Sequence, residues 1–448
     1  MKHVRIGNGC GFWGDNIDAP RELAEHGRLD YLTLEYLAEL TMSILALQKQ
    51  RHPEAGHASD FLDVLQQLVP ILQRQPQLKI ITNAGGMNPH GCAVRARALL
   101  DQAGLTKRRI AIVHGDDLLP RLDDLLAQGH AFTNLDSGEP LSTVRERIVS
   151  VNAYLGCQPI VTALQQGADV VITGRVADAS LTLGPAVHEF GWKWDDWDRL
   201  AAGTVAGHLI ECGAQATGGL WCNWQETDLA LVGYPLADIE ESGAFVLTKP
   251  PGSGGAVNRE TVAEQLLYEV GDPVAYLTPD VVADFTSVQL TECGRDEVRI
   301  TAARGRAATD SYKVSISYRD GWTASGTLVI AGPAAATKAR RCGEIIFERL
   351  RRAGVSPQQR NIECLGAGES VPGVLPIVDA PEVVLRVSVR DADRAVVERF
   401  SKEFAPLVTS GPPGVTGYTT GRPPVREVFA YWPALVDKST IAAQIQTL

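Results

Sequence analysis

The chain of 448 residues lacks the signatures of several large protein classes. Its eight cysteines are scattered, with no C-x-x-C motif and no Cys/His spacing typical of a zinc site. We therefore expect reduced thiols and a cytoplasmic location. No run approaches the roughly 20 apolar residues of a membrane span. The first residues lead directly into a predicted strand and include no long apolar run, so we expect no signal peptide and no membrane partner.

Acidic residues outnumber basic ones, and the resulting net charge of −11 is spread along the chain. Binding of nucleic acid needs clustered Lys and Arg, so the sequence argues against a nucleic-acid partner. One basic cluster, at 338–352, also contains Glu344 and Glu348, and we interpret it as a solvated helix face. The glycines at 7, 9, 11 and 14 do not match the G-x-G-x-x-G spacing of dinucleotide-binding proteins. P-loop, G-x-S-x-G, H-E-x-x-H and kinase signatures are missing as well.

Apolar runs alternate with helical patterns over the first part of the chain. Hydrophobic residues make up 45% and charged residues 21% of the sequence, as in ordinary globular proteins. Buried strands are predicted at 4–6, 31–35, 78–82, 110–113 and 169–172, with helical segments between them. A short strand near 131–135 and a kink or break at Pro70 are also predicted. This order predicts an α/β fold with a largely parallel sheet and flanking helices over residues 1–280, whether open or closed into a barrel. Within it, residues 190–270 are rich in helices and loops.

The pattern changes after residue 280. Alternating apolar residues at 314–318 and 383–389 predict half-buried strands, and helices are expected at 337–353 and 392–405. We predict a smaller C-terminal α+β domain of the ferredoxin-like type over residues 281–448. Its stretch 411–424 is rich in Pro and Gly and is expected to form a surface loop or arm.

Reactive polar residues follow several of the predicted strands. The C-terminal edge of such a sheet is where ligands bind, because strand tips and helix N-termini converge there. His114 and Asp116 suit acid–base work or a divalent cation, or they cap the next helix and bond locally. Asp136 and Glu139 flank a tight turn and are further catalytic candidates, although Asp and Gly there also suit a plain turn.

Other residues at these tips are candidates for binding a substrate. Arg175 at a helix start could clamp a carboxylate or phosphate, or it could form a structural pair with Asp178. The loop at 249–255 could be an anion-binding nest or a flexible loop. His208 is expected to be a buried core histidine, although Glu211 and Cys212 share its helix face. The full set of candidate binding residues is Asn83, Asn88, Arg175, Asp178, Ser180, Lys249 and Ser253.

Six stretches of the chain resemble one known family. They are 6–15 (IGNGCGFWGD), 30–39 (DYLTLEYLAE), 82–86 (TNAGG), 171–180 (VITGRVADAS), 207–219 (GHLIECGAQATGG) and 248–252 (TKPPG). Together they resemble the acyclic terpene utilisation protein A (AtuA) family over most of the chain. The resemblance implies a role in the catabolism of citronellol- and geraniol-type terpenes and of branched acids, beside acyl-CoA carboxylases, dehydrogenases and hydratases. It also implies the ferredoxin-like domain, and it transfers no catalytic residues.

These observations predict an enzyme of acyclic terpene or branched-acid catabolism. Its substrate would be a small carboxylic acid or its CoA thioester, and its reaction a hydratase- or lyase-type acid–base step. We also expect a homo-oligomer. The alternative is a non-catalytic binding or assembly partner of an acyl-CoA carboxylase. An enzyme should bring the tips at 83–88, 114–117, 134–139 and 175–180 around one pocket.

Overall fold

The computed structural model describes residues 2–417 and 421–448. It divides into two compact units, the first comprising the chain up to Ser317 together with Tyr431–Leu448 and the second comprising Tyr318–Ala430. The domain boundary predicted near residue 280 stays a prediction. Of the predicted arm at 411–424, residues 418–420 lie outside the described part. No described helix is long and apolar enough to cross a membrane.

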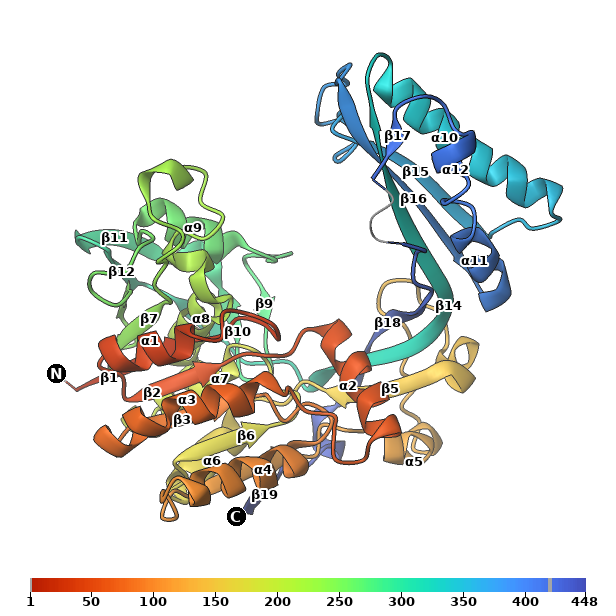
Figure 1. The fold of residues 1–448 in the computed structure, drawn as a ribbon. Coiled ribbons are helices and arrows are strands. Elements are labelled where there is room, and N and C mark those ends of the chain that lie inside the picture. The colour runs from red at the N-terminus through yellow and green to blue at the C-terminus, as the bar shows by residue number, and fades with distance from the viewer. Residues whose placement is uncertain (1, 418–420) are drawn as a thin grey trace. The chain divides into compact units, whose positions relative to one another are not determined.

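A ten-stranded sheet forms the framework of the first unit (Figure 1). Its central five strands are mutually parallel, and their residues are almost all buried, as expected for a sheet with both faces covered. In order across the sheet they are β1 (His3–Asn8), β2 (Tyr31–Leu34), β3 (Lys79–Thr82), β6 (Val170–Thr173) and β4 (Ile110–His114).

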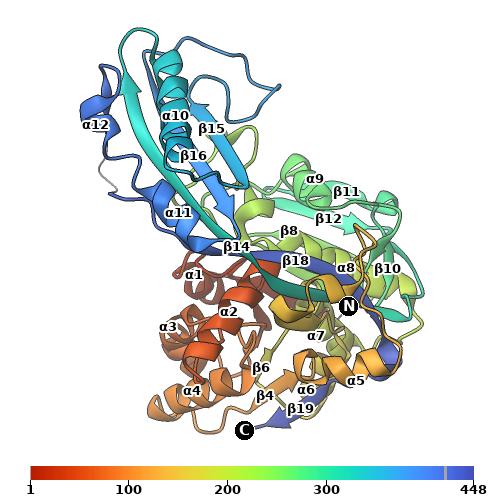
Figure 2. The ribbon, with the colours of Figure 1, turned by 90° about the vertical axis from the view of Figure 1, so that its right-hand side faces the viewer.

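Antiparallel strands extend both edges of this parallel core, so the sheet is mixed and the prediction of a largely parallel sheet is wrong. β7 (Leu236–Glu240) pairs with β1, and β8 (Phe245–Thr248), β12 (Glu297–Thr301) and β11 (Gln289–Gly294) follow in that order. At the other edge, β19 (Gln444–Thr447) lies antiparallel beside β4 (Figure 2). These strands come from segments far along the chain, whose pairing local periodicity does not reveal. The strand order has two different ends, so the sheet is open.

Two helix layers cover the parallel strands. On one face, apolar side chains of α1 (Ala19–His26), α3 (Asp60–Arg74) and α4 (Pro89–Gln102) form one core with β2, β3, β6 and β4. The other face is covered by α6 (Gln158–Gln165), α7 (Ser180–Phe190) and α8 (Trp197–Glu211). The neighbouring strands β3 and β6 are followed by helices on opposite faces of the sheet, α4 and α7, and open α/β sheets form binding crevices at such a position.

Shorter elements connect this framework. Pro70 lies inside an uninterrupted α3, so the predicted break is wrong. Residues 131–135 form no strand, and the strand of this region is instead β5 (Ile148–Ala153). The remaining elements of this unit are α2 (Glu39–Arg51), α5 (Leu122–Ala127), α9 (Arg259–Leu267), β9 (Tyr276–Leu277), β10 (Val282–Asp284) and β13 (Arg304–Arg306).

The second unit packs helices on one face of a small sheet, so it has the predicted α+β character. Its strand order is β15 (Gln359–Leu365), β16 (Glu382–Asp391), β14 (Ser311–Ala331) and β17 (Val415–Thr416), with β18 (Arg426–Asp437) also paired to β14. Alternate apolar residues of β14 and β16 pack beneath α10 (Ala335–Arg352) and α11 (Arg394–Ser401), and the short α12 (Leu407–Ser410) joins them. That this unit has the ferredoxin-like topology in particular stays a prediction.

Candidate active site

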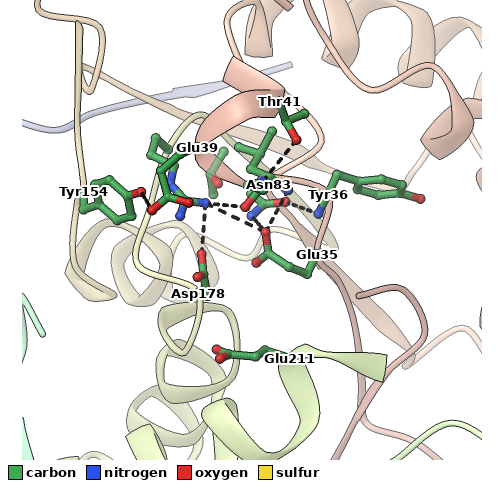
Figure 3. Close-up of polar contacts among 12 residues, drawn as sticks. Glu35, Tyr36, Glu39, Thr41, Asn83, Tyr154, Asp178 and Glu211 are labelled. Atoms are coloured by element: carbon green, nitrogen blue, oxygen red, sulfur yellow. Dashed lines mark hydrogen bonds and ion pairs between the residues drawn. The ribbon is translucent and has the colours of Figure 1, made fainter. Parts of the chain in front are cut away.

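Polar residues from three neighbouring strand tips meet at the C-terminal edge of the parallel core. Glu35 follows β2, Asn83 follows β3 and Arg175 follows β6, and all three are buried. Figure 3 shows the side chains of Glu35 and Asn83 close together, with Glu39, Tyr154 and Asp178 beside them. We refer to Glu35, Glu39, Asn83, Tyr154, Arg175, Asp178 and Lys313 as the Arg175 cluster.

The guanidinium of Arg175 is the centre of this cluster, with only 2% of the side chain exposed. Its Nη1 donates to the Leu37 carbonyl at 2.8 Å and forms an ion pair with Asp178 Oδ1 at 2.9 Å. The same nitrogen lies 3.9 Å from Glu35 Oε1. The aromatic ring of Tyr154 lies 4.1 Å below the guanidinium carbon, a cation–π arrangement. The cation is thus fixed by at least four partners, and the predicted Arg175–Asp178 pair does form.

Close backbone approach at Gly174 allows Arg175 to sit this deeply. A Cβ atom on Gly174 would lie 2.3 Å from Asp116 Oδ1. The other carboxylate oxygen of Asp116 accepts from the Arg175 backbone N–H at 2.8 Å and from Asn152 Nδ2 at 2.9 Å. Asp116 is therefore a buried brace between strand tips, and burial raises its pKa to about 6.

Glu35 is buried against Asn83 and the chain that follows it. The Glu35 Oε1 atom accepts from the Asn83 amide and from the Leu37 N–H, the latter at 2.9 Å. The Asn83 Oδ1 atom accepts in turn from the Tyr36 N–H at 2.8 Å. The second oxygen, Oε2, is buried with no hydrogen-bond partner among the described residues. Burial, followed by repulsion from Asp178, raises the pKa of Glu35 well above its ordinary value, and Arg175 opposes this only partly.

Asp178 and Glu39 are the two partly exposed carboxyls of the cluster, with 36% and 40% of their side chains exposed. Burial alone would raise the pKa of Glu39, but contacts with the Tyr154 hydroxyl and Lys313 lower it to about 2, so Glu39 stays ionised. Burial raises the pKa of Asp178, and the negative charges of Glu211 and Glu39 raise it further, while the positive charge of Arg175 lowers it only partly. Two carboxyls thus flank one guanidinium, and both have raised pKa values. Such a coupled pair retains one proton between its members near neutral pH, which suits it to acid–base work.

A second cation lies at the exposed side of the cluster. Lys313 Nζ is 3.2 Å from Glu39 Oε1 and 4.8 Å from the centre of the Tyr154 ring, and 46% of its side chain is exposed. Burial alone would lower the pKa of Lys313, but Tyr431 and Glu39 raise it overall, so the amine stays protonated. The Tyr154 hydroxyl donates to Glu39 Oε1 at 2.7 Å. Lys313 is therefore an accessible cation able to meet an anionic ligand.

The histidine of α8 borders this region without entering it. His208 is buried, with Nδ1 3.1 Å from Glu211 Oε1 and Nε2 2.9 Å from the Gln265 carbonyl oxygen. The interpretation as a core histidine is confirmed. Glu211 contributes to the cluster at a distance, by raising the pKa of Asp178.

A separate pocket of about 420 Å³ contains other predicted residues of the same edge. It brings together Asn88 and His114 from two predicted tips, and Asp116 forms part of its wall. Asn88 is the N-cap of α4, accepting from the Gly91 N–H at 3.0 Å. The α2 helix runs from Glu39 in the Arg175 cluster to Lys49 in this pocket, so about 15 Å of helix separates them.

The remaining predicted residues lie elsewhere. Asp136 and Glu139 are exposed on a turn that bonds within itself through Asn134 and Ser137. Ser180 Oγ donates to Asp280 at 3.1 Å. The tips at 83–88, 114–117 and 175–180 thus surround two adjacent sites, and the tip at 134–139 takes part in neither.

The Lys249 loop is closed by its own cation. Lys249 Nζ donates to the Ser253 carbonyl at 2.9 Å and pairs with Asp296 at 3.2 Å, and its side chain is almost wholly buried. These contacts bind the loop together, so the ammonium already has partners.

No group of three or more His, Cys, Asp or Glu residues within the described parts of the chain has a geometry that could hold a metal ion. The carboxyls of the Arg175 cluster are arranged around a guanidinium instead.

Sequence reasoning placed Asn83, Arg175 and Asp178 at a site but missed Glu35, Glu39, Tyr154 and Lys313. Glu35 ends a buried strand at the same edge as the other tips, and that position was the available signal. Lys313 reaches the cluster because the Tyr154 N–H bonds to its carbonyl at 2.9 Å, where β5 pairs with β14. Nothing local in the sequence marks that contact.

Comparison with known proteins gives one match. The sequence model described as "Acyclic terpene utilisation family protein AtuA" matches residues 4–447. No curated protein and no solved structure shows significant similarity to the chain.

Proposed function

The chain belongs to the acyclic terpene utilisation family AtuA, and from this premise we propose that it is an acid–base enzyme of terpene or branched-acid catabolism. Its substrate would be a small branched carboxylic acid or its CoA thioester, and its reaction a hydration, dehydration or related lyase step. The observation that carries this proposal is the Arg175 guanidinium held between two carboxyls, Glu35 and Asp178, whose pKa values are both raised. A cytoplasmic location and a homo-oligomeric state are part of the same proposal.

Each member of the cluster has a role in such a step. Lys313, protonated and exposed, binds the carboxylate or polarises the thioester carbonyl of the substrate. Asp178 moves the proton, because it is the partly exposed carboxyl whose pKa is raised. Glu35 and Arg175 lie behind it and set its protonation state, because the charge of Arg175 is shared between the two carboxyls.

A hydration written at this site balances without another reactant. Ionised Asp178 takes a proton from water as the water oxygen bonds to one carbon of a C=C bond. The carboxyl then delivers a proton to the other carbon, so the product contains the elements of one water and Asp178 is again ionised. Dehydration is the reverse sequence.

The test is turnover of a panel of acyclic terpenoid and branched-chain acids and their CoA thioesters by purified protein. Asp178→Asn should lose on the order of 100-fold or more in turnover, since it removes the proton carrier and keeps the size of the side chain. The matched control is Glu139→Gln, an exposed carboxyl outside the cluster, which should keep wild-type turnover.

Two results would contradict the proposal. Unchanged turnover in Asp178→Asn would exclude its role, and a large loss in His114→Ala instead would assign the proton transfer to the neighbouring pocket. Absence of turnover with every panel member, together with co-purification of acyl-CoA carboxylase subunits, would favour a binding or assembly function.

A further inference from the structure

The pocket beside the Arg175 cluster brings two cationic side chains together with two carboxylates. Its walls include Lys49 from α2 and Arg121, with His90 and His114 also lining it. Two carboxylates line it as well: Asp117 is partly accessible, and Asp116 is buried and bonded to Asn152 and the Arg175 N–H. The Asp116 carboxylate is already engaged by these two donors, so Lys49 and Arg121 are cations of this pocket that can meet an anionic ligand.

The existing contacts of these cations leave hydrogen-bonding capacity. Lys49 Nζ donates to the Met87 carbonyl at 2.5 Å, which uses one of its three N–H groups and fixes the ammonium at the pocket wall. Arg121 Nη2 donates to the Thr440 carbonyl at 3.3 Å, a long bond that leaves most of the guanidinium's donors for another partner. Neutral amides of Gln444 and Gln446 complete the lining with further donors and acceptors.

The C-terminal segment closes this pocket in a way that requires glycine. Gly115 has a φ of +106°, and a Cβ atom there would lie 2.7 Å from the Ala442 carbonyl oxygen. Ala442 and β19 therefore pack directly against the tip of β4 and form one wall. The resulting volume of about 420 Å³ lies within the range of small-ligand sites and exceeds what a bare inorganic ion needs.

We propose that this pocket is a binding site for a phosphate monoester, held by Lys49 and Arg121. The two cations supply charge-assisted hydrogen bonds to phosphate oxygens, and His90 and His114 add ring nitrogens to the same wall. The phosphate belongs either to a small phosphorylated metabolite or to the nucleotide end of a CoA thioester. The site does not depend on the reaction proposed for the Arg175 cluster, since it is measured by binding alone.

Isothermal titration calorimetry on the full chain tests this site with three probes: inorganic phosphate, glycerol 3-phosphate and adenosine 3′,5′-bisphosphate. Wild-type protein should bind at least one of them. Tighter binding of the bisphosphate would identify the nucleotide end of CoA as the source, and tighter binding of glycerol 3-phosphate a small metabolite. Arg121→Gln and Lys49→Gln should each weaken binding roughly tenfold.

Two further variants separate a binding site from a general effect on folding. Asp117→Asn should strengthen phosphate binding several-fold, because it removes the opposing charge while its amide oxygen can still accept from the Leu119 N–H. Lys107→Gln, an exposed lysine outside the pocket, should bind as wild type does. The proposal is overturned if the wild type binds none of the probes at millimolar concentration. It is also overturned if Arg121→Gln matches Lys107→Gln, or if Asp117→Asn weakens binding.

Discussion

Asp116 offers a direct test of the electrostatics at the strand tips. Both of its hydrogen bonds, from the Arg175 N–H and from Asn152 Nδ2, are to the same oxygen, Oδ2. An asparagine in this place can keep both bonds with its single carbonyl oxygen and presents its NH2 group where Oδ1 stood. Asp116→Asn therefore removes the titrating group and preserves the brace.

The size of the expected effect follows from the pKa. Burial raises the pKa of Asp116 from 3.8 to about 6 in the folded protein, so between these values the folded state binds more protons than the unfolded state. Stability contributed by the protonated form is thus lost as the pH rises through this window. Between these pH values the free energy of unfolding of the wild type falls by about 1.4 kcal/mol per pH unit relative to that of Asp116→Asn. The shift in pKa from 3.8 to about 6 therefore costs the wild type about 3 kcal/mol in total.

Urea unfolding followed by tryptophan fluorescence, at several pH values from 4 to 7, measures this difference. The free energy of unfolding of Asp116→Asn minus that of the wild type should grow with pH and level off above pH 6. Asp116→Ala should instead be destabilised without this growth, because two buried donors lose their acceptor at a cost of about 1–3 kcal/mol each. A constant difference between Asp116→Asn and wild type across the range would refute the raised pKa.

Three other changes give separate tests. Lys249→Met should lower the melting temperature and expose the 249–255 loop to limited proteolysis, because Asp296 then lacks the Lys249 ammonium. Turnover should stay at the wild-type level, and a loss of turnover would assign this loop to the active site. Glu35→Gln should raise the free energy of unfolding more at pH 9 than at pH 5, since the raised pKa of the buried carboxyl makes its ionisation costly; equal effects at both pH values would contradict that. Gly207→Ala should destabilise the protein by about 1–3 kcal/mol, because its Cβ would lie 2.7 Å from the backbone of Ala179; a wild-type melting temperature would show that α7 and α8 can separate freely.

The parallel core could be predicted because its signal is local. Each of its strands is a short apolar run followed by a helix, and both the run and the helical spacing can be found within about 25 residues. The antiparallel strands could not be placed in this way. β19 begins 330 residues after β4 ends, and β7 pairs with β1 from the middle of the chain, so only tertiary packing determines these pairs.

The residues of the Arg175 cluster likewise divide into those placed by local sequence and those placed by long-range pairing. Arg175 and Asp178 lie three residues apart on one tip, so their pairing could be expected from sequence. The position of Lys313 depends on the pairing of β5 with β14, and the sequence pattern predicts no strand where β5 lies. His114 and Asp116 were assigned to one catalytic group because they are close in sequence. The strand β4 ends at His114, and Gly115 turns the chain with a φ of +106°, so the pattern of β4 does not set the direction of Asp116, which faces the Arg175 backbone.

Proton exchange with solvent is the sharpest test of proton transfer at the Arg175 cluster, because it detects acid–base chemistry before the net reaction is known. Purified protein is incubated with the acid and thioester panel in D2O, and the deuterium content of the recovered substrates and products is measured by mass spectrometry. We expect deuterium incorporation into at least one compound by the wild type and by Glu139→Gln, and a loss of this incorporation on the order of 100-fold in Asp178→Asn. Equal incorporation by wild type and Asp178→Asn would contradict the assignment of the Arg175 cluster as the site of proton transfer.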